Sequence, residues 1–274
     1  MTLLGVLAGL VSAAVFGVAA VVQASAVRGF ESEPSGLWGF VRRSATDWRT
    51  LSVVVAYLVG FVLHAVAIWL LPLYLAQALV AMSLPVTALV SRRVEAALSR
   101  RGWTAVGLVT GGLVLLSLGA GEPGAVVVDG RLVAALWVGV AVLALASLRG
   151  SHLSGPVLGL LAGLGYAGSA IATRGVGTPV EPLVVIAALA VPSFSVVAFW
   201  MYSLGMSRAA VPAASASLVV AQTFVPSAIG VALLGDGVRE GWWPAVVVGL
   251  LLAMTGATWL GIEIRTPESQ ETWS

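Results

Sequence analysis

Between Thr50 and Ser91 the chain runs for 42 residues without an aspartate, glutamate, lysine or arginine. A helix needs about 20 apolar residues to cross the hydrocarbon core of a bilayer, so this stretch is long enough for two crossings. The chain must turn near the middle of the stretch, where Leu71-Pro72 lies. We therefore predict two membrane helices, 51–70 and 72–91, joined by a turn of a few residues.

The rest of the sequence has the same character. Hydrophobic residues make up 59% of the 274 positions and charged residues 9%, and the mean hydropathy is +1.03. A soluble domain of this size could not bury so much apolar surface, so lipid is the expected solvent. We predict an all-α polytopic membrane protein with about nine transmembrane helices, near 3–23, 51–70, 72–91, 103–120, 132–148, 155–173, 183–204, 209–234 and 243–262.

The arginines predict the orientation of these spans. The fourteen basic residues are all arginine, and nine spans place eleven of them on one side. The other side receives Arg131, Arg174 and Arg239. By the positive-inside rule the eleven-arginine side is cytoplasmic, so the N-terminus is outside and the C-terminus is cytoplasmic. The lack of lysine, with many alanines, valines and glycines, indicates a GC-rich genome, and we expect a bacterial plasma membrane.

Three segments need separate interpretation. Residues 29–50 form a polar connection in which Gly36–Arg43 is expected to lie flat at the cytoplasmic interface, with a gate as the alternative. Residues 263–274 predict a disordered cytoplasmic tail. Residues 1–26 end in the small-x-small pattern of a signal-peptidase site, yet they lack a basic start and have a long apolar run, so we expect the first span there.

Two pairs of segments resemble each other across the chain. LLGVLAGLVSAAVFGVA, from Leu3, matches VLGLLAGLGYAGSAIAT, from Val157; SLPVTALVS around Pro85 matches FVPSAIGVA around Pro226. We predict inverted four-helix repeats with one linking helix: a first repeat over 1–120, a linking span over 121–149 and a second repeat over 150–262. The fifth crossing inverts the second repeat, as in many secondary transporters. Chance similarity among Ala/Gly/Leu-rich helices is the alternative.

The segments ALVAMSLPVTALVSRR and SLVVAQTFVPSAIGVALLGD, with the two small-residue helices, resemble the drug/metabolite transporter superfamily, in particular its EamA-like group. The nine-span layout is similar to the magnesium-transporter branch called NIPA. This resemblance covers residues 3–262 and implies alternating-access transport of a small organic metabolite or drug-like solute, or of magnesium in the NIPA alternative. The sequences Arg92-Arg93-Val94-Glu95 and Gly235-Asp236 stand where family members often carry Gly-Glu.

Two prolines and two glutamines predict where a substrate would bind. A proline inside a membrane helix frees a carbonyl and kinks the axis, and that carbonyl must face protein or a water-filled cavity. Pro85 and Pro226 are therefore expected to shape the walls of a central cavity. Gln77 and Gln222 lie within about 80° of the faces of these prolines, at 100° per residue. They are predicted to line the cavity, with hydrogen bonding between helices as the alternative.

His64 is a titratable side chain deep in a predicted span, and such residues are candidates for function. Tyr57 lies seven residues earlier, on the same helical face. We predict that His64 and Tyr57, with Tyr166 and Trp200 from the second half, contact the substrate. A satisfied core histidine, and packing or interfacial anchoring of the aromatic rings, are the alternatives.

The residues that are absent exclude several functions. No predicted span holds an Asp or Glu, so acidic cation cages are missing from the core, which favours an uncharged, zwitterionic or amphipathic solute over magnesium. No arrangement typical of a hydrolase or of a nucleotide-binding loop occurs. We therefore predict no enzyme activity, catalytic residue, cofactor, metal site or nucleic-acid partner. The expected partners are the lipid bilayer and a small-molecule substrate; a scaffold or lipid flippase component is the further alternative.

Glycines spaced by four residues form three stripes, which allow helices to approach closely and indicate tight bundling or a homodimer. They begin at Gly5, Gly107 and Gly155.

Overall fold

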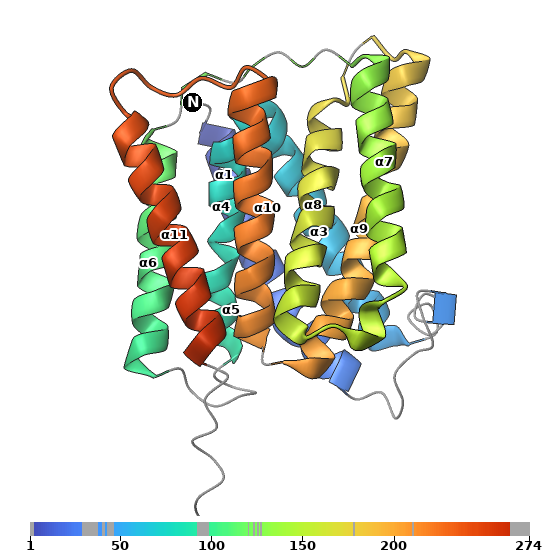
Figure 1. The fold of residues 1–274 in the computed structure, drawn as a ribbon, viewed down its shortest axis with the longest axis vertical. Coiled ribbons are helices and arrows are strands. Elements are labelled where there is room, and N and C mark those ends of the chain that lie inside the picture. The colour runs from blue at the N-terminus through green and yellow to red at the C-terminus, as the bar shows by residue number, and fades with distance from the viewer. Residues whose placement is uncertain are drawn as a thin grey trace, which may run out of the picture.

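The computed structural model of the chain describes residues 3–28, 38–39, 42, 47–91, 99–119, 121–122, 124, 126, 128–177, 179–209 and 211–263. A helix, or a pair of helices for span 72–91, occupies each of the nine predicted spans, and the described residues thus confirm the all-α prediction (Figure 1). Most of the predicted interfacial segment and of the tail lie outside the described residues. The helices are α1 (Leu3–Arg28), α3 (Trp48–Leu70), α4 (Leu73–Ala81), α5 (Ser83–Ser91), α6 (Arg100–Leu118), α7 (Gly130–Ser147), the 3₁₀ turn η1 (Gly150–His152), α8 (Gly155–Arg174), α9 (Pro182–Arg208), α10 (Val211–Leu233) and α11 (Trp243–Glu263).

The lengths and composition of the helices are those of a multi-pass membrane protein. Over the described residues, eight helical stretches are long and apolar enough to cross a bilayer, with α4 and α5 counted as one. The described apolar part of α11, Trp243–Gly256, is shorter. The outer surface agrees with lipid as solvent, because Val138, Val142 and Leu145 on α7 are 61–65% exposed.

Polar side chains cap the starts of α3, α6 and α7. The Asp47 carboxylate accepts hydrogen bonds from the Arg49 and Thr50 amides at the start of α3. The hydroxyl of Thr50 also donates to this carboxylate at 2.6 Å, and this bond lowers the pKa of Asp47. Asp129 caps α7 in the same way, accepting from the Leu132 amide at 2.8 Å. These caps satisfy amides that a helix start leaves without partners.

The predicted turn at Leu71-Pro72 is confirmed. Helix α3 ends at Leu70, Leu71 and Pro72 are extended, and α4 begins at Leu73. All nine residues of α4 are buried. The long apolar stretch therefore makes two crossings, and the first half of the second one is enclosed by protein.

The prolines act differently from one another. A ring at Pro85 would clash with the Ala81 carbonyl of a continuous helix. The helix ends at Ala81, and α5 restarts at Ser83, so Pro85 lies in the first turn, where a missing N–H costs little. Helix α10, by contrast, continues through Pro226. A break at Met82 thus replaces the expected bend near Pro85, whereas α10 stays helical through Pro226.

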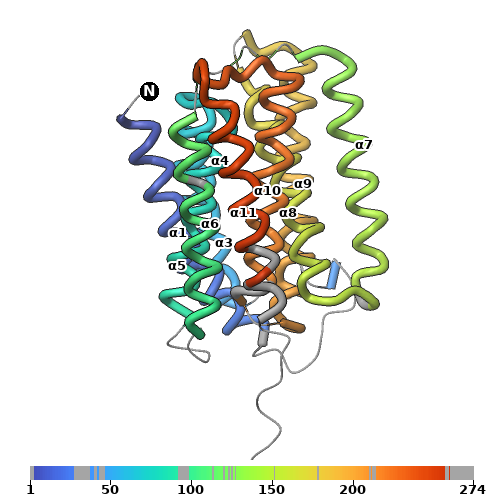
Figure 2. Tube along the Cα trace, turned by 60° about the vertical axis from the view of Figure 1, so that its left-hand side comes forward, coloured from blue at the N-terminus to red at the C-terminus, as the bar shows by residue number. Residues whose placement is uncertain are grey.

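The helices form a bundle with two distinct edges (Figures 1 and 2). In one half α1 packs along α3, α4 and α5, and in the other α8 packs along α9 and α10. Helices α6 and α11 lie side by side at one edge of the view in Figure 1, and α7 covers α8 and α9 at the other. The first helices of the two predicted repeats, α1 and α8, therefore each pack against the other helices of their own half.

The glycine stripes have different surroundings. A Cβ atom on Gly159 would lie 2.3 Å from the Ala214 carbonyl oxygen, and one on Gly163 would lie 2.4 Å from that of Leu218. The absence of side chains thus lets α8 approach the backbone of α10. Gly107 and Gly111 on α6 have no atom within 4 Å of their Cβ positions. Tight bundling is confirmed for the stripe on α8 but not for Gly107 and Gly111.

Candidate functional site

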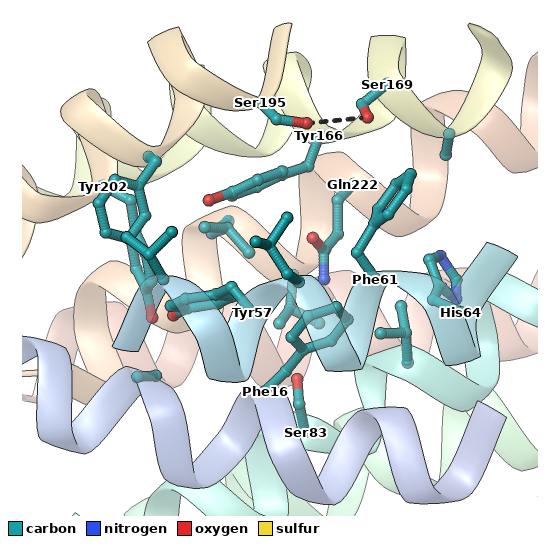
Figure 3. A pocket seen from close by; sticks show the side chains of 18 of the residues that line it. Phe16, Tyr57, Phe61, His64, Ser83, Tyr166, Ser169, Ser195, Tyr202 and Gln222 are labelled. Atoms are coloured by element: carbon teal, nitrogen blue, oxygen red, sulfur yellow. Dashed lines mark hydrogen bonds between the residues drawn. The ribbon is translucent and has the colours of Figure 1, made fainter. Parts of the chain in front are cut away.

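A cavity of about 600 Å³ lies in the middle of the bundle and is lined by residues of α1, α3, α4, α5, α8, α9 and α10. Figure 3 shows its interior, with aromatic rings and a few polar groups on the walls. Among the described residues that line it there is no aspartate, glutamate, lysine or arginine. The described lining of the cavity therefore suits an uncharged molecule.

The structure brings five of the eight predicted site residues together in the lining: Tyr57, His64, Gln77, Tyr166 and Gln222. Their role in binding a substrate stays a prediction. Pro85, Pro226 and Trp200 do not belong to the lining. Pro226 and Trp200 are buried, and Pro85 is half-buried. The glutamines thus reach the cavity, whereas the prolines that were expected beside them pack outside it.

Aromatic rings from three helices form one wall. The ring of Tyr57 on α3 stacks on Phe16 of α1 and meets Phe199 of α9 edge-on, with centroid distances of 5.7 Å in both pairs. Gly60 makes room for this arrangement, because a Cβ atom there would lie 2.6 Å from the Phe16 ring. Such offset and edge-to-face pairs fix ring orientation. The wall gives a flat apolar or aromatic molecule a matching surface.

A hydrogen-bonded chain behind the wall holds Tyr57. Its hydroxyl donates to Oε1 of Gln23 at 2.7 Å. The Gln23 amide nitrogen in turn donates to Oγ of Ser203 at 2.6 Å, and the Ser203 hydroxyl donates to the Phe199 carbonyl at 2.8 Å. Gln23 is only 1% exposed. This chain ties α1, α3 and α9 together and leaves the Tyr57 ring, not its hydroxyl, as the exposed cavity surface.

His64 and Gln77 form a polar pair at the other end of the cavity. The Gln77 amide nitrogen lies 3.3 Å from Nε2 of His64. An amide nitrogen only donates, so with the amide assigned in this orientation Nε2 accepts and a neutral ring carries its proton on Nδ1. That Nδ1 is buried without a hydrogen-bond partner among the described residues. This nitrogen is shut off from the open space, so it is an unsatisfied donor inside the wall and not part of the cavity surface.

Gln222 on α10 and Tyr166 on the neighbouring helix α8 both point into the open space (Figure 3). Ser169 and Ser195 nearby bond to each other, with 3.1 Å between their hydroxyl oxygens. Tyr202 and Ser215 likewise pair, with 2.5 Å between their oxygens. Most hydroxyls on the walls are thus paired, while the Gln222 amide, the Tyr166 hydroxyl and Nδ1 of His64 make no hydrogen bond to the described residues.

One end of the bundle is closed by a buried ion pair. Arg174, at the end of α8, lies 3.0 Å from Oδ1 of Asp236, which follows α10. The side chains are 6% and 0% exposed. Arg174 also donates to the carbonyls of Ile68, Leu71 and Gly124, and Asp236 accepts from the amides of Leu73 and Gly124 at 2.8 Å. Both side chains thus bond to backbone groups as well as to each other, and the pair links the α3–α4 turn to the second half of the chain.

Tyr74 adds to this closed end. Its hydroxyl lies within hydrogen-bonding distance of the Gly119 and Gly237 carbonyls, at 3.1 and 2.6 Å. Backbone bonds between the loops that follow α6 and α10 surround it, such as Gly121 N to Gly237 O at 3.0 Å. The loops of both halves meet here, and polar contacts hold them together at this end.

Sequence reasoning missed several of these residues. Gln23 is a lone amide in an otherwise apolar span, and that signal could have marked it. The Arg174–Asp236 pair joins residues 62 positions apart, and no periodic pattern predicts such a contact. Phe16 and Phe199 look like ordinary lipid-facing or core residues until their helices are placed.

Searches against protein-family models, curated proteins and solved structures find no significant match to this chain.

Proposed function

We propose that this membrane protein is a secondary carrier of the drug/metabolite transporter type, which moves a small uncharged organic solute by alternating access. The uncharged cavity at the centre of the bundle carries this proposal. Its volume of about 600 Å³ lies within the range of roughly 300–1,000 Å³ typical of pockets for drug-sized ligands. Aromatic surface with a few unpaired hydrogen-bonding groups suits an organic solute.

The packing of the helices supports inverted repeats over 1–120 and 150–262. Within the first half α1 packs on α3 and on α4–α5, and within the second α8 packs on α9 and α10. Between the halves α1 meets α9 as α3 meets α8, and α6 meets α11. A pseudo-twofold axis in the membrane plane produces this set of pairs. The halves would then rock about the cavity that they share.

The magnesium alternative has less support. Mg²⁺ prefers hard oxygen ligands and usually one or two carboxylates. The described lining contains no carboxylate, and the described residues contain no group of three His, Asp or Glu side chains that could hold a metal ion. The residues present therefore favour an organic solute over a divalent cation.

A single introduced cysteine tests the carrier mechanism, because the chain contains no cysteine of its own. We expect Gln222→Cys in proteoliposomes to react with a membrane-impermeant maleimide added to either face, since alternating access exposes the cavity to each side in turn. The matched control is Met201→Cys on α9, which is 0% exposed and should stay unlabelled. Labelling of Gln222→Cys no faster than this control, from both faces, would contradict the proposal.

A second prediction concerns affinity. Once a panel of neutral compounds has yielded a ligand that raises the melting temperature, Gln222→Leu should weaken its binding by about tenfold, the loss expected from one buried hydrogen bond of ~1.4 kcal/mol. Ser227→Ala is the control, because Ser227 lies on the same helix and its hydroxyl donates to the Thr223 carbonyl. Equal binding to both variants would remove Gln222 from the site.

A further inference from the structure

The exposed part of the cavity lining lies on two helices. Among the described residues of the lining, four are exposed to the surroundings: Leu51 and Leu58 on α3, and Pro192 and Val196 on α9. Leu58 is 58% exposed and Val196 is 47% exposed. All other lining residues are buried or half-buried. The cavity therefore opens sideways between α3 and α9. Leu51 lies only three residues after Trp48, near the start of α3, so we name the deeper residues, Leu58, Pro192 and Val196, the side opening.

The level of the side opening follows from the rise of the helices. Leu58 lies ten residues after Trp48 and Val196 twelve residues before Arg208, which at 1.5 Å per residue gives about 15 and 18 Å. The Tyr57–Phe199 ring contact confirms that these two helices share one level there. A hydrocarbon core is about 30 Å thick, so the opening lies near its middle. Acyl chains, not water or headgroups, surround it.

The rim of the side opening is as apolar as its surroundings. Leucine, proline and valine form it. The nearby Ser195 hydroxyl donates its hydrogen to the Val191 carbonyl of the same helix at 2.8 Å. A charged group would lose its hydration on passing this rim, at a cost that nothing in the described lining repays. Entry here selects for molecules that already dissolve in hydrocarbon.

Behind the rim the polarity changes. The Gln222 amide and the Tyr166 hydroxyl offer hydrogen bonds that no described residue takes. A molecule that is wholly apolar would leave these groups unsatisfied, whereas one with a neutral hydrogen-bonding group would pair with them. The aromatic wall of Phe16 and Tyr57 would contact the apolar body of such a molecule.

We propose that the solute is an uncharged amphipathic molecule, dissolved in the bilayer, which enters the cavity through the side opening between α3 and α9. This inference rests on the proposed carrier function and names its substrate class and route. A phospholipid is excluded as the solute, because its phosphate would find no arginine or lysine in the described lining. The cargo is instead a small molecule that partitions into membranes.

Nile red, an uncharged amphipathic dye, is a suitable probe for the protein in phosphatidylcholine vesicles. Its binding is followed by stopped-flow energy transfer from the chain's tryptophans. We expect a saturable component for the wild type, and Leu58→Phe with Val196→Phe should slow its appearance by about tenfold, since added bulk narrows the route. Leu189→Phe is the control, because Leu189 is 54% exposed on the same helix and does not line the cavity. It should bind at the wild-type rate.

Further arms separate the two proposals. Gln222→Leu should lower dye affinity without slowing entry, and tetraphenylphosphonium, a lipid-soluble cation, should not compete. Failure of the dye to bind the wild type, or competition by the cation, would overturn the solute class. Unchanged entry into the doubly filled variant would overturn the route. Each of these results leaves the cysteine labelling of Gln222→Cys intact, whereas failure of that labelling removes the carrier itself.

Discussion

Replacing Asp236 with alanine is expected to lower the free energy of unfolding by about 3–5 kcal/mol, the cost of removing one partner of a buried ion pair. The substitution leaves the Arg174 guanidinium buried with no counter-charge. It also removes the acceptor for the Leu73 and Gly124 amides. At roughly 2–4 °C per kcal/mol for a chain of this size, the melting temperature in detergent should fall by about 10 °C.

Asp129→Ala provides the matched control for Asp236→Ala. Asp129 is also an aspartate in a loop next to a helix, but it is exposed and only caps α7, so its loss should cost about 1 kcal/mol. A double variant, Arg174→Met with Asp236→Leu, should recover much of the stability, because no charge remains buried. If Asp236→Ala and Asp129→Ala have the same melting temperature, the Arg174–Asp236 ion pair does not stabilise this end of the bundle.

The second large effect concerns the glycine stripe on α8, compared with the one on α6. Gly159→Val combined with Gly163→Val should destabilise the protein by about 1–3 kcal/mol at each site, the usual cost of overpacking. Added side chains would meet the α10 backbone, and the contacts at 2.3 and 2.4 Å involve carbonyl oxygens that cannot swing aside. We expect low yields of folded protein and early melting in detergent, measured by circular dichroism and size-exclusion chromatography.

Gly107→Val with Gly111→Val is the control, because nothing lies within 4 Å of those Cβ positions. This variant should fold and melt as the wild type does. A change in its oligomeric state would place these glycines in a homodimer interface, in agreement with the sequence-based prediction. Equal destabilisation by the two double substitutions would mean that the packing of α8 on α10 is not as described.

The spans and the turn at Leu71-Pro72 could be predicted because both depend on local properties, namely the length of apolar runs and the position of a proline. Several cavity residues could also be predicted, since polar side chains such as Gln77 and Gln222 rarely stand at membrane depth without a partner. Their common orientation, however, depends on how the helices are rotated. The same uncertainty explains why Pro85 and Pro226 were expected on the cavity walls and lie outside them.

Contacts between distant segments were beyond prediction. Gly107 and Gly159 belong to identical Gly-x-x-x-Gly patterns, and only the placement of neighbouring helices distinguishes a packed stripe from an open one. Gln23 and Ser203 are 180 residues apart, and neither is unusual in its own segment. The break at Met82 could not be predicted either, because a proline alone does not show whether a helix bends or ends and starts again.

At the closed end of the bundle, amide hydrogen exchange would report how often the loops separate. The amide hydrogens of Leu73 and Gly124 are held by Asp236, so deuterium from the solvent replaces them only when the loops part. Mass spectrometry of peptides that contain these two amides would therefore measure how fast the loops separate in the unmodified protein. The measurement does not require a known substrate. A compound that holds the loops together would slow the exchange of both amides.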